Sequence, residues 1–263
     1  MYAGWLSLTD YTLLTVGGPV WNDFANYIDM WSDPTFIESI WKTVRWTVSI
    51  VALQLLLALP VALFLNLRFK ARGILRSIVF MPYVMPAAVV AVIWVYMFDS
   101  SFGVVNDLLQ SLNLTDVNIA FLSSSTWSFW VLVLAMVWHG APLMVIILLA
   151  ALQSVRHDAL EAAELDGAGR WKRFVHVVLP HLMPTIWLVV LLRTMWMAHH
   201  VETIALLTNG GPGTANYTMP MYSFGLATQD YDVAYGSAVA IVLSLMLLVL
   251  ATIYIRNLER AKA

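Results

Sequence analysis

The sequence contains no cysteine, and only 11% of its 263 residues are charged. Without cysteine the chain has no disulfide framework, no thiolate nucleophile and no cysteine-based zinc or iron–sulfur site. Soluble domains carry about 25% charged residues, so the shortage of charge argues against a typical cytosolic enzyme. A net charge of −2 gives no general attraction to the phosphates of nucleic acid, and no nucleic-acid partner is expected. The sequence also lacks G-x-x-x-x-G-K-[ST], which excludes an ATP-binding phosphate loop on this chain.

Apolar residues dominate what remains: 60% of the chain is hydrophobic, and the mean hydropathy is +0.76. A helix needs roughly 20 apolar residues to cross a bilayer. Five segments meet this requirement: 46–67, 78–97, 130–152, 182–207 and 234–255. The fourth is the least uniform, because it contains Arg193, His199, His200 and Glu202. These segments predict an all-α polytopic membrane protein with five transmembrane helices.

The basic residues indicate the orientation of these helices. Eleven of the 14 lie after the first span, after the third span and in the C-terminal tail. Segments 1–40, 98–129 and 208–233 contain none, yet they hold ten of the 16 acidic residues. Because cytoplasmic loops are rich in Lys and Arg, the N-terminus is expected outside and the C-terminus inside. We therefore divide the chain into an external segment, 1–40, and a transmembrane domain, 41–263, with a cytoplasmic loop at 153–180.

This orientation leaves an exported N-terminal segment with neither a signal peptide nor a preceding span. We therefore expect that a first transmembrane helix is missing from the sequence. The alternative is a genuine start outside the membrane, with the N-terminal residues at the bilayer interface.

The predicted cytoplasmic loop contains a short helix. Asp158 followed by Glu161 is an Asp version of the capping box and predicts a helix start, and Gly167 suits the helix end. A helix of about eight residues is too short to be stable alone in water, so it needs a surface to pack on. Small residues would allow close approach, and acidic residues would suit basic groups on a partner. The alternative is an ordinary solvated helix. After it, Pro180 and Pro184 predict a change in chain direction.

Several motifs resemble a known family. The run Glu161-Ala162-Ala163, then Asp166-Gly167-Ala168 and Leu179-Pro180, resembles the EAA signature of ABC importer permeases. The run Asn209-Gly210-Gly211-Pro212-Gly213, followed by Tyr222 and by Ala-Tyr-Gly-Ser-Ala from residue 234, resembles the carbohydrate-uptake branch, which includes maltose- and glycerol-phosphate-like permeases.

The resemblance implies a type I importer permease in a bacterial or archaeal cytoplasmic (inner) membrane, transporting a sugar or sugar derivative. It implies a coupling helix that docks on an ATPase through Glu161, Ala162, Ala163, Asp166 and Gly167. It places the turn formed by Gly210, Gly211 and Pro212 near an extracytoplasmic solute-binding protein. The other implied partners are two ABC ATPases and a second permease, which in this branch is usually a different chain. ATP and magnesium would be bound by the ATPases, with no cofactor on this chain. Family members have six or more helices, which again suggests a missing first helix.

Polar residues at membrane depth are the candidates for the substrate pathway, because they are costly unless they face a cavity or a partner. These candidates are His139 with its neighbour Trp138, and Arg193 with Trp196. Each has a structural alternative: His139 could bond to a neighbouring carbonyl, Arg193 could lie at a subunit interface, and tryptophans are common in membrane girdles. No metal site is expected, since adjacent histidines 199 and 200 point to different helix faces.

Two other function classes make different demands on the sequence. An intramembrane enzyme would need a nucleophile or metal motif, and neither G-x-S-x-G nor H-E-x-x-H occurs. A proton-coupled secondary transporter could use His139 and Arg193 but would need no docking helix.

Overall fold

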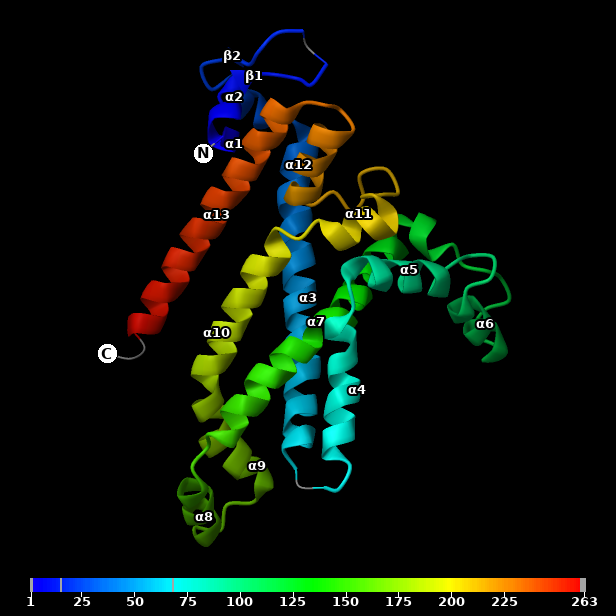
Figure 1. The fold of residues 1–263 in the computed structure, drawn as a ribbon. Coiled ribbons are helices and arrows are strands. Elements are labelled where there is room, and N and C mark those ends of the chain that lie inside the picture. Colours follow the sequence, from blue (N-terminus) through cyan, green and yellow to red (C-terminus); the bar gives the residue numbers. More distant parts are fainter. Residues whose placement is uncertain (1, 15, 68, 261–263) are drawn as a thin grey trace.

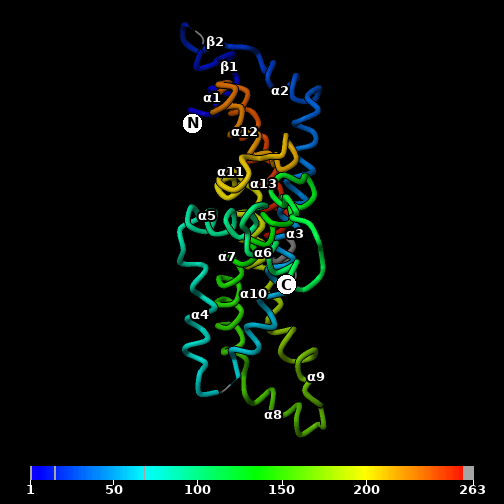
Figure 2. The backbone as a smooth tube through the Cα atoms, turned by 90° about the vertical axis from the view of Figure 1, so that its right-hand side faces the viewer, coloured from blue at the N-terminus to red at the C-terminus, as the bar shows by residue number. Residues whose placement is uncertain are grey.

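The computed structural model describes residues 2–14, 16–67 and 69–260, with side chains through Arg256. Long helices run side by side along one direction, and short elements gather at both ends (Figures 1 and 2). We refer to these ends as the α12 end and the α8 end. Arg68 and Lys262, which contributed to the predicted orientation, lie outside the described residues.

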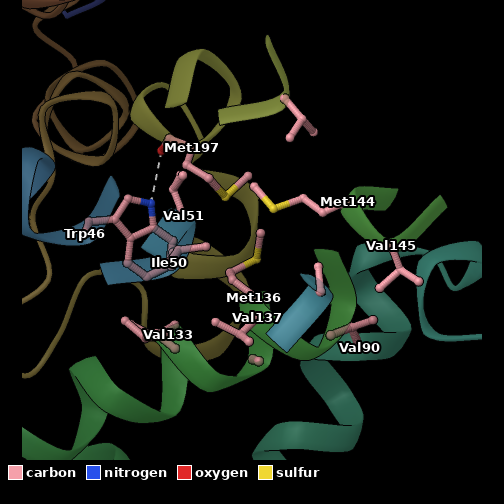
Figure 3. Packing of buried hydrophobic residues seen from close by; sticks show 14 of the residues in the cluster. Trp46, Ile50, Val51, Val90, Val133, Met136, Val137, Met144, Val145 and Met197 are labelled. Carbon is pink, nitrogen blue, oxygen red and sulfur yellow. Dashed lines mark hydrogen bonds between the residues drawn. The ribbon is translucent and has the colours of Figure 1, made fainter. Parts of the chain in front are cut away.

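Helices α3 (Pro34–Asn66) and α7 (Ser125–Gln153) pack along each other and form the centre of the fold. The Asp33 carboxylate accepts a hydrogen bond from the Thr35 backbone at 2.8 Å, and Pro34 supplies the fixed φ that suits a first helical turn. The main core lies between these helices and their neighbours (Figure 3). In it the Trp46 indole donates to the Met197 backbone carbonyl at 3.0 Å. This bond joins α3 to α10 inside the membrane-spanning part of the chain.

The second predicted span is not one straight helix. It consists of α4 (Arg72–Val84) and α5 (Ala87–Met97), which are bent by 95° at the break between them. Met85 is extended, with ψ of 136°, because the residue before a proline avoids the α region, and Pro86 follows. The expectation of a continuous helix over 78–97 is therefore wrong.

The predicted span 182–207 is also wrong in its bounds. The apolar helix runs from Arg170 to Ala198, through α9 (Arg170–Arg173), the π-helical turn η2 (Phe174–Val178) and α10 (Leu179–Ala198). The π-turn accommodates the proline that follows it, so Pro180 and Pro184 lie inside a continuing helix and do not turn the chain.

The chain turns later, at His199, before α11 (Glu202–Thr208) begins. The His200 ring stabilises this start, because its Nε2 accepts from the Thr203 backbone at 3.3 Å.

At the α12 end, α12 (Met219–Thr228) and the first turns of α13 (Val233–Arg260) pack together (Figure 1). The N-terminal elements cover them: α1 (Tyr2–Leu6), α2 (Ala25–Met30) and two short antiparallel strands. The strands are β1 (Thr9–Asp10) and β2 (Val20–Trp21), with Thr9 opposite Trp21. A second apolar cluster, which includes Met30, Phe36 and Met219, lies beneath.

The remaining elements are α6 (Val104–Ser111), the short turn η1 (Phe121–Ser123) and α8 (His157–Leu165). Within the described residues, four helices are long and apolar enough to cross a membrane, and the bent α4–α5 pair raises this to five. The all-α polytopic class is therefore confirmed, with one span broken.

The Asp33 carboxylate joins three elements at the α12 end. It accepts hydrogen bonds from the hydroxyls of Tyr222 at 2.6 Å and Tyr235 at 2.9 Å. Burial raises the pKa of this carboxyl, but these bonds and those from the backbone of Phe36 and Thr35 outweigh burial and lower it below its usual value.

A lowered folded-state pKa predicts how stability depends on pH. The contribution of Asp33 is complete above the unfolded-state pKa, about 3.9, and is lost as pH falls through the lower folded-state value. We expect Asp33→Asn to destabilise the protein by about 1–3 kcal/mol at pH 7, because two tyrosines lose an ionised acceptor. Thermal unfolding of the purified protein at pH 7 and pH 3 measures this, with the exposed Asp116→Asn as control. An Asp33→Asn protein as stable as wild type at pH 7 would contradict the prediction.

Candidate functional site

Two regions contain the residues predicted to function, and the first is the short helix α8 beyond the long helices (Figure 1). The helix starts two residues earlier than the capping box predicts, with Arg156 instead of Asp158 as N-cap and no side-chain cap bond. The predicted capping box is therefore wrong, and the Asp158 carboxylate instead lies 3.1 Å from the Arg156 guanidinium. Both side chains are largely exposed, so this pair contributes little to stability.

The predicted helix end is confirmed. Gly167 has a φ of +74°, a conformation in which glycine carries no side-chain penalty. Its N–H donates to the Glu164 carbonyl at 3.0 Å, and the Ala168 N–H donates to the Ala163 carbonyl at 2.9 Å. These two bonds form a Schellman motif and fix the end of the helix.

None of the residues of α8 is buried, and Leu165 is 90% exposed. An ion pair between Glu164 and Arg173, at 2.6 Å, ties the helix to α9. The motif residues Glu161, Ala162, Asp166 and Gly167 are exposed, and Ala163 is partly so. The chain therefore presents a short, rigidly terminated helix with its surface uncovered.

The second region is a cavity of about 390 Å³ at the meeting point of the two helix breaks, between α4 and α5 and between α10 and α11. It brings together three predicted residues, His139, Arg193 and Trp196. Trp138 is not among its lining residues; its ring lies 6.2 Å from that of Trp94. The other lining residues are Tyr83, Met136, Gly140, Met197, His199, His200, Val201 and Glu202.

His139 makes the bond to a carbonyl that the sequence left open, while its role in the substrate pathway stays a prediction. Its Nε2 lies 3.2 Å from the Met85 carbonyl at the α4–α5 break. A carbonyl only accepts, so Nε2 donates this bond and carries the proton. The ring is half-buried and also lines the cavity. His139 therefore connects the Met85 carbonyl, at the break between α4 and α5, to the cavity lining.

Arg193 is only 3% exposed, although it carries a full charge. Its Nε donates to Gln54 Oε1 at 2.9 Å, and Gln54 Nε2 in turn donates to the Met136 carbonyl at 2.7 Å. Gln54 therefore bridges three helices, as expected of a single polar residue in an apolar span. The Arg193 guanidinium centre also lies 5.8 Å from the ring of Trp196, within cation–π range.

Gly140 makes room for this arrangement. A Cβ at residue 140 would lie 2.2 Å from Arg193 Nη2 and 2.4 Å from Gln54 Nε2. Those separations are far below contact distance, so this packing requires glycine.

The glycine-rich run after α11 forms a compact turn at the α12 end. Gly210 has a φ of +80°, and a Cβ there would lie 2.3 Å from the Tyr217 ring. Asn216 Nδ2 donates to the Gly211 carbonyl at 2.6 Å and to Ser128 Oγ at 2.9 Å. These bonds tie the turn, which also includes Pro212, to the start of α7. The turn predicted from Gly210, Gly211 and Pro212 has this geometry, and its contact with a partner stays a prediction.

Sequence reasoning missed part of the cavity. Gly140 and Gln54 did carry a signal, as isolated small or polar residues in apolar helices. Tyr83 carried none, because nothing in the sequence brings α4 to the cavity, and Met136 carried none, because it is one apolar residue among many in α7. The sequence offered His199, His200 and Glu202 as an unfavoured metal site, Glu202 as a partner for Arg193, and the two histidines as a weak indication of an acidic or phosphorylated sugar. They line the cavity because the helix breaks there.

Comparison with known proteins places these regions in context. Residues 54–262 match the family described as binding-protein-dependent transport system inner membrane component. The chain is 33% identical to the sulfoquinovosyl glycerol transport permease SmoG of Agrobacterium fabrum, covering 97% of this chain and 82% of that protein. It is 35% identical to the trehalose/maltose transport permease MalF of Thermococcus litoralis, covering 88% and 77%.

Solved structures give the same result. A bacterial ABC transporter involved in import of the acidic polysaccharide alginate matches with a TM-score of 0.80 and 26% identity, over 91% of this chain and 84% of that chain. The family model, which matches residues 54–262, covers the second part of α3 and all of α4 through α13. The chain therefore belongs to the inner membrane components of binding-protein-dependent transport systems, the ABC importer permeases.

Proposed function

We propose that this chain is the permease subunit of an ATP-driven, binding-protein-dependent importer of a sugar or sugar derivative. The relatives named as sugar permeases support this cargo class. In the assembled importer the chain pairs with a second permease, two ATPases that hold ATP and magnesium, and a solute-binding protein. A related importer has been crystallised in complex with a periplasmic protein that holds an alginate pentasaccharide.

The exposed helix α8 is the observation that carries the coupling part of this proposal. It lies at the end where the predicted cytoplasmic loops gather, and the described part of the chain buries none of its residues. Because a nine-residue helix is marginal alone, a groove on an ATPase would provide the missing surface. Ala162 and Ala163 permit close approach, and Glu161 and Asp166 supply charge for basic groups.

In the proposed mechanism the ATPases close on ATP and move α8 with them. The long helices then rock, and the cavity between the two helix breaks opens to the outside, where the binding protein delivers the substrate near the turn at Gly210, Gly211 and Pro212. Hydrolysis returns the complex to its inward-facing state. This cycle needs only two conformations that the ATPase stabilises differently. The N-terminus and the α12 end then face outward, and α8 and the C-terminus face the cytoplasm of a bacterial or archaeal cell.

The absence of native cysteine offers a direct test of docking. A single Ala162→Cys, labelled with a benzophenone maleimide, is expected to crosslink to a co-expressed ABC ATPase, because this residue would lie in the groove. Ala71→Cys is the matched control, since Ala71 is exposed in the loop between α3 and α4 at the same end of the chain. Mass spectrometry of the crosslinked band identifies the partner. An ATPase that crosslinks equally well to both variants, or only to Ala71→Cys, would overturn the docking surface.

A further inference from the structure

The cavity contains a buried positive charge without a negative partner. Arg193 is 3% exposed, and the described part of the chain places no carboxylate within ion-pair distance of its guanidinium. Its neighbours are neutral: the Gln54 amide oxygen at 2.9 Å and the Met197 sulfur at 3.8 Å. An uncompensated charge at membrane depth is costly, so such residues pair with a partner or mark a substrate pathway.

The guanidinium is also held in a fixed orientation. Gln54, fully buried, fixes Nε from α3, and Gly140 leaves the space that Nη2 occupies. Among the described residues, Nη1 has no hydrogen-bond partner. A planar guanidinium held at one edge, with free donors beside a cavity, suits recognition of a carboxylate, sulfonate or phosphate.

The rest of the lining adds little negative charge. His139, His199 and His200 are neutral or positive, and Trp196 adds an aromatic ring to the lining. Glu202 is the one acidic lining residue, and its side chain is exposed. The buried part of the cavity is therefore positive, while the acidic group lies at its edge.

We propose that the cavity takes a sugar bearing a negatively charged group, and that Arg193 binds this group. The inference rests on the proposed function, because the cavity has to lie on the transport route. The negatively charged group of the substrate would then pair with the Arg193 guanidinium, which has no carboxylate partner among the described residues.

The test uses the assembled importer in nanodiscs, with the binding protein omitted so that its own selectivity does not contribute. Glucuronate and glucose serve as probes, since they differ by a carboxylate in place of a hydroxymethyl group. We expect calorimetry to show glucuronate binding about 10- to 100-fold more tightly than glucose, the value of one charged hydrogen-bonded contact. Arg193→Gln is expected to remove this preference.

Two further variants separate recognition from folding. Gln54→Glu is nearly isosteric and places a carboxylate next to Arg193 Nε, so it should also abolish the preference. It keeps an acceptor for Arg193 Nε but loses the bond that Gln54 Nε2 donates to the Met136 carbonyl. Arg45→Gln is the control, because Arg45 stacks on Phe129 at 3.6 Å and does not line the cavity; it should leave the preference intact.

Several outcomes would overturn the inference. They are equal binding of both probes, no glucuronate binding at millimolar concentration, and an unchanged preference in Arg193→Gln. Loss of the second permease from Arg193→Gln complexes, but not from Arg45→Gln complexes, would show that Arg193 pairs with a partner carboxylate instead. ATP-dependent uptake by the same complex tests the proposed function separately: if uptake occurs without an acid preference, only this inference fails.

Discussion

Replacing Gly167 with proline is expected to abolish coupled transport. Gly167 has a φ of +74°, whereas proline is restricted to about −65°, so the turn after α8 cannot form unchanged. Proline also removes the N–H that donates to the Glu164 carbonyl at 3.0 Å. A cost of about 3 kcal/mol at the helix end corresponds to a loss of ~100-fold in the population of a correctly shaped α8.

Uptake and ATP hydrolysis, measured together in proteoliposomes, separate coupling from general damage. Gly167→Pro is expected to lose uptake, with hydrolysis no longer tied to substrate delivery. Glu161→Lys should have the same effect by reversing a charge on the docking surface. The matched control is Gly169→Ala: Gly169 has a φ of −65° and open space where a Cβ would lie, so alanine fits. Full transport by both Gly167→Pro and Glu161→Lys would refute the coupling role of α8.

The long helices could be predicted from composition because each needs only a continuous apolar run. α7 and α13 follow the predicted spans within a few residues at most ends. The two spans that were wrong each break at a particular residue. At Pro86 the preceding residue is forced out of the helical region, and at His199 the helix ends where polar side chains find partners in the break.

Prolines alone did not indicate these breaks. Pro142 and Pro184 lie inside continuous helices, whereas Pro86 begins a new one. The difference lies in whether neighbouring residues and a π-turn can absorb the lost hydrogen bond, and that depends on packing between distant segments.

The cavity illustrates the same limit. The sequence singled out His139 and Arg193 because ionisable side chains are rare in a span, and the structure places both in the lining of one cavity, from α7 and α10. The sequence could not indicate that Tyr83 and Glu202 also line the cavity, since both reach it only because the chain bends between α4 and α5 and between α10 and α11. The Gly140–Arg193 contact joins residues of two helices, and no local pattern encodes it.

Gly140→Val is expected to eliminate transport while leaving the long helices formed. The branched side chain would enter the space that Arg193 Nη2 and Gln54 Nε2 occupy, at separations of 2.2 and 2.4 Å already for its Cβ. Both groups are held by hydrogen bonds, so the guanidinium must leave its position beside the cavity. Overpacking of this kind costs about 1–3 kcal/mol.

The decisive comparison is between stability and transport. Gly140→Val should retain assembly with its partner subunits and lose substrate-dependent uptake, because the bond between Arg193 and Gln54 is lost while the apolar contacts of α3 and α7 remain. Gly225→Ala is the matched helical control: its Cβ would lie 3.5 Å from the Tyr217 hydroxyl, an ordinary contact. If Gly140→Val transports as well as Gly225→Ala, the position of the Arg193 guanidinium does not matter for transport. The valine side chain would then fit next to Arg193 and Gln54, so these two side chains would have to be able to move although hydrogen bonds hold them.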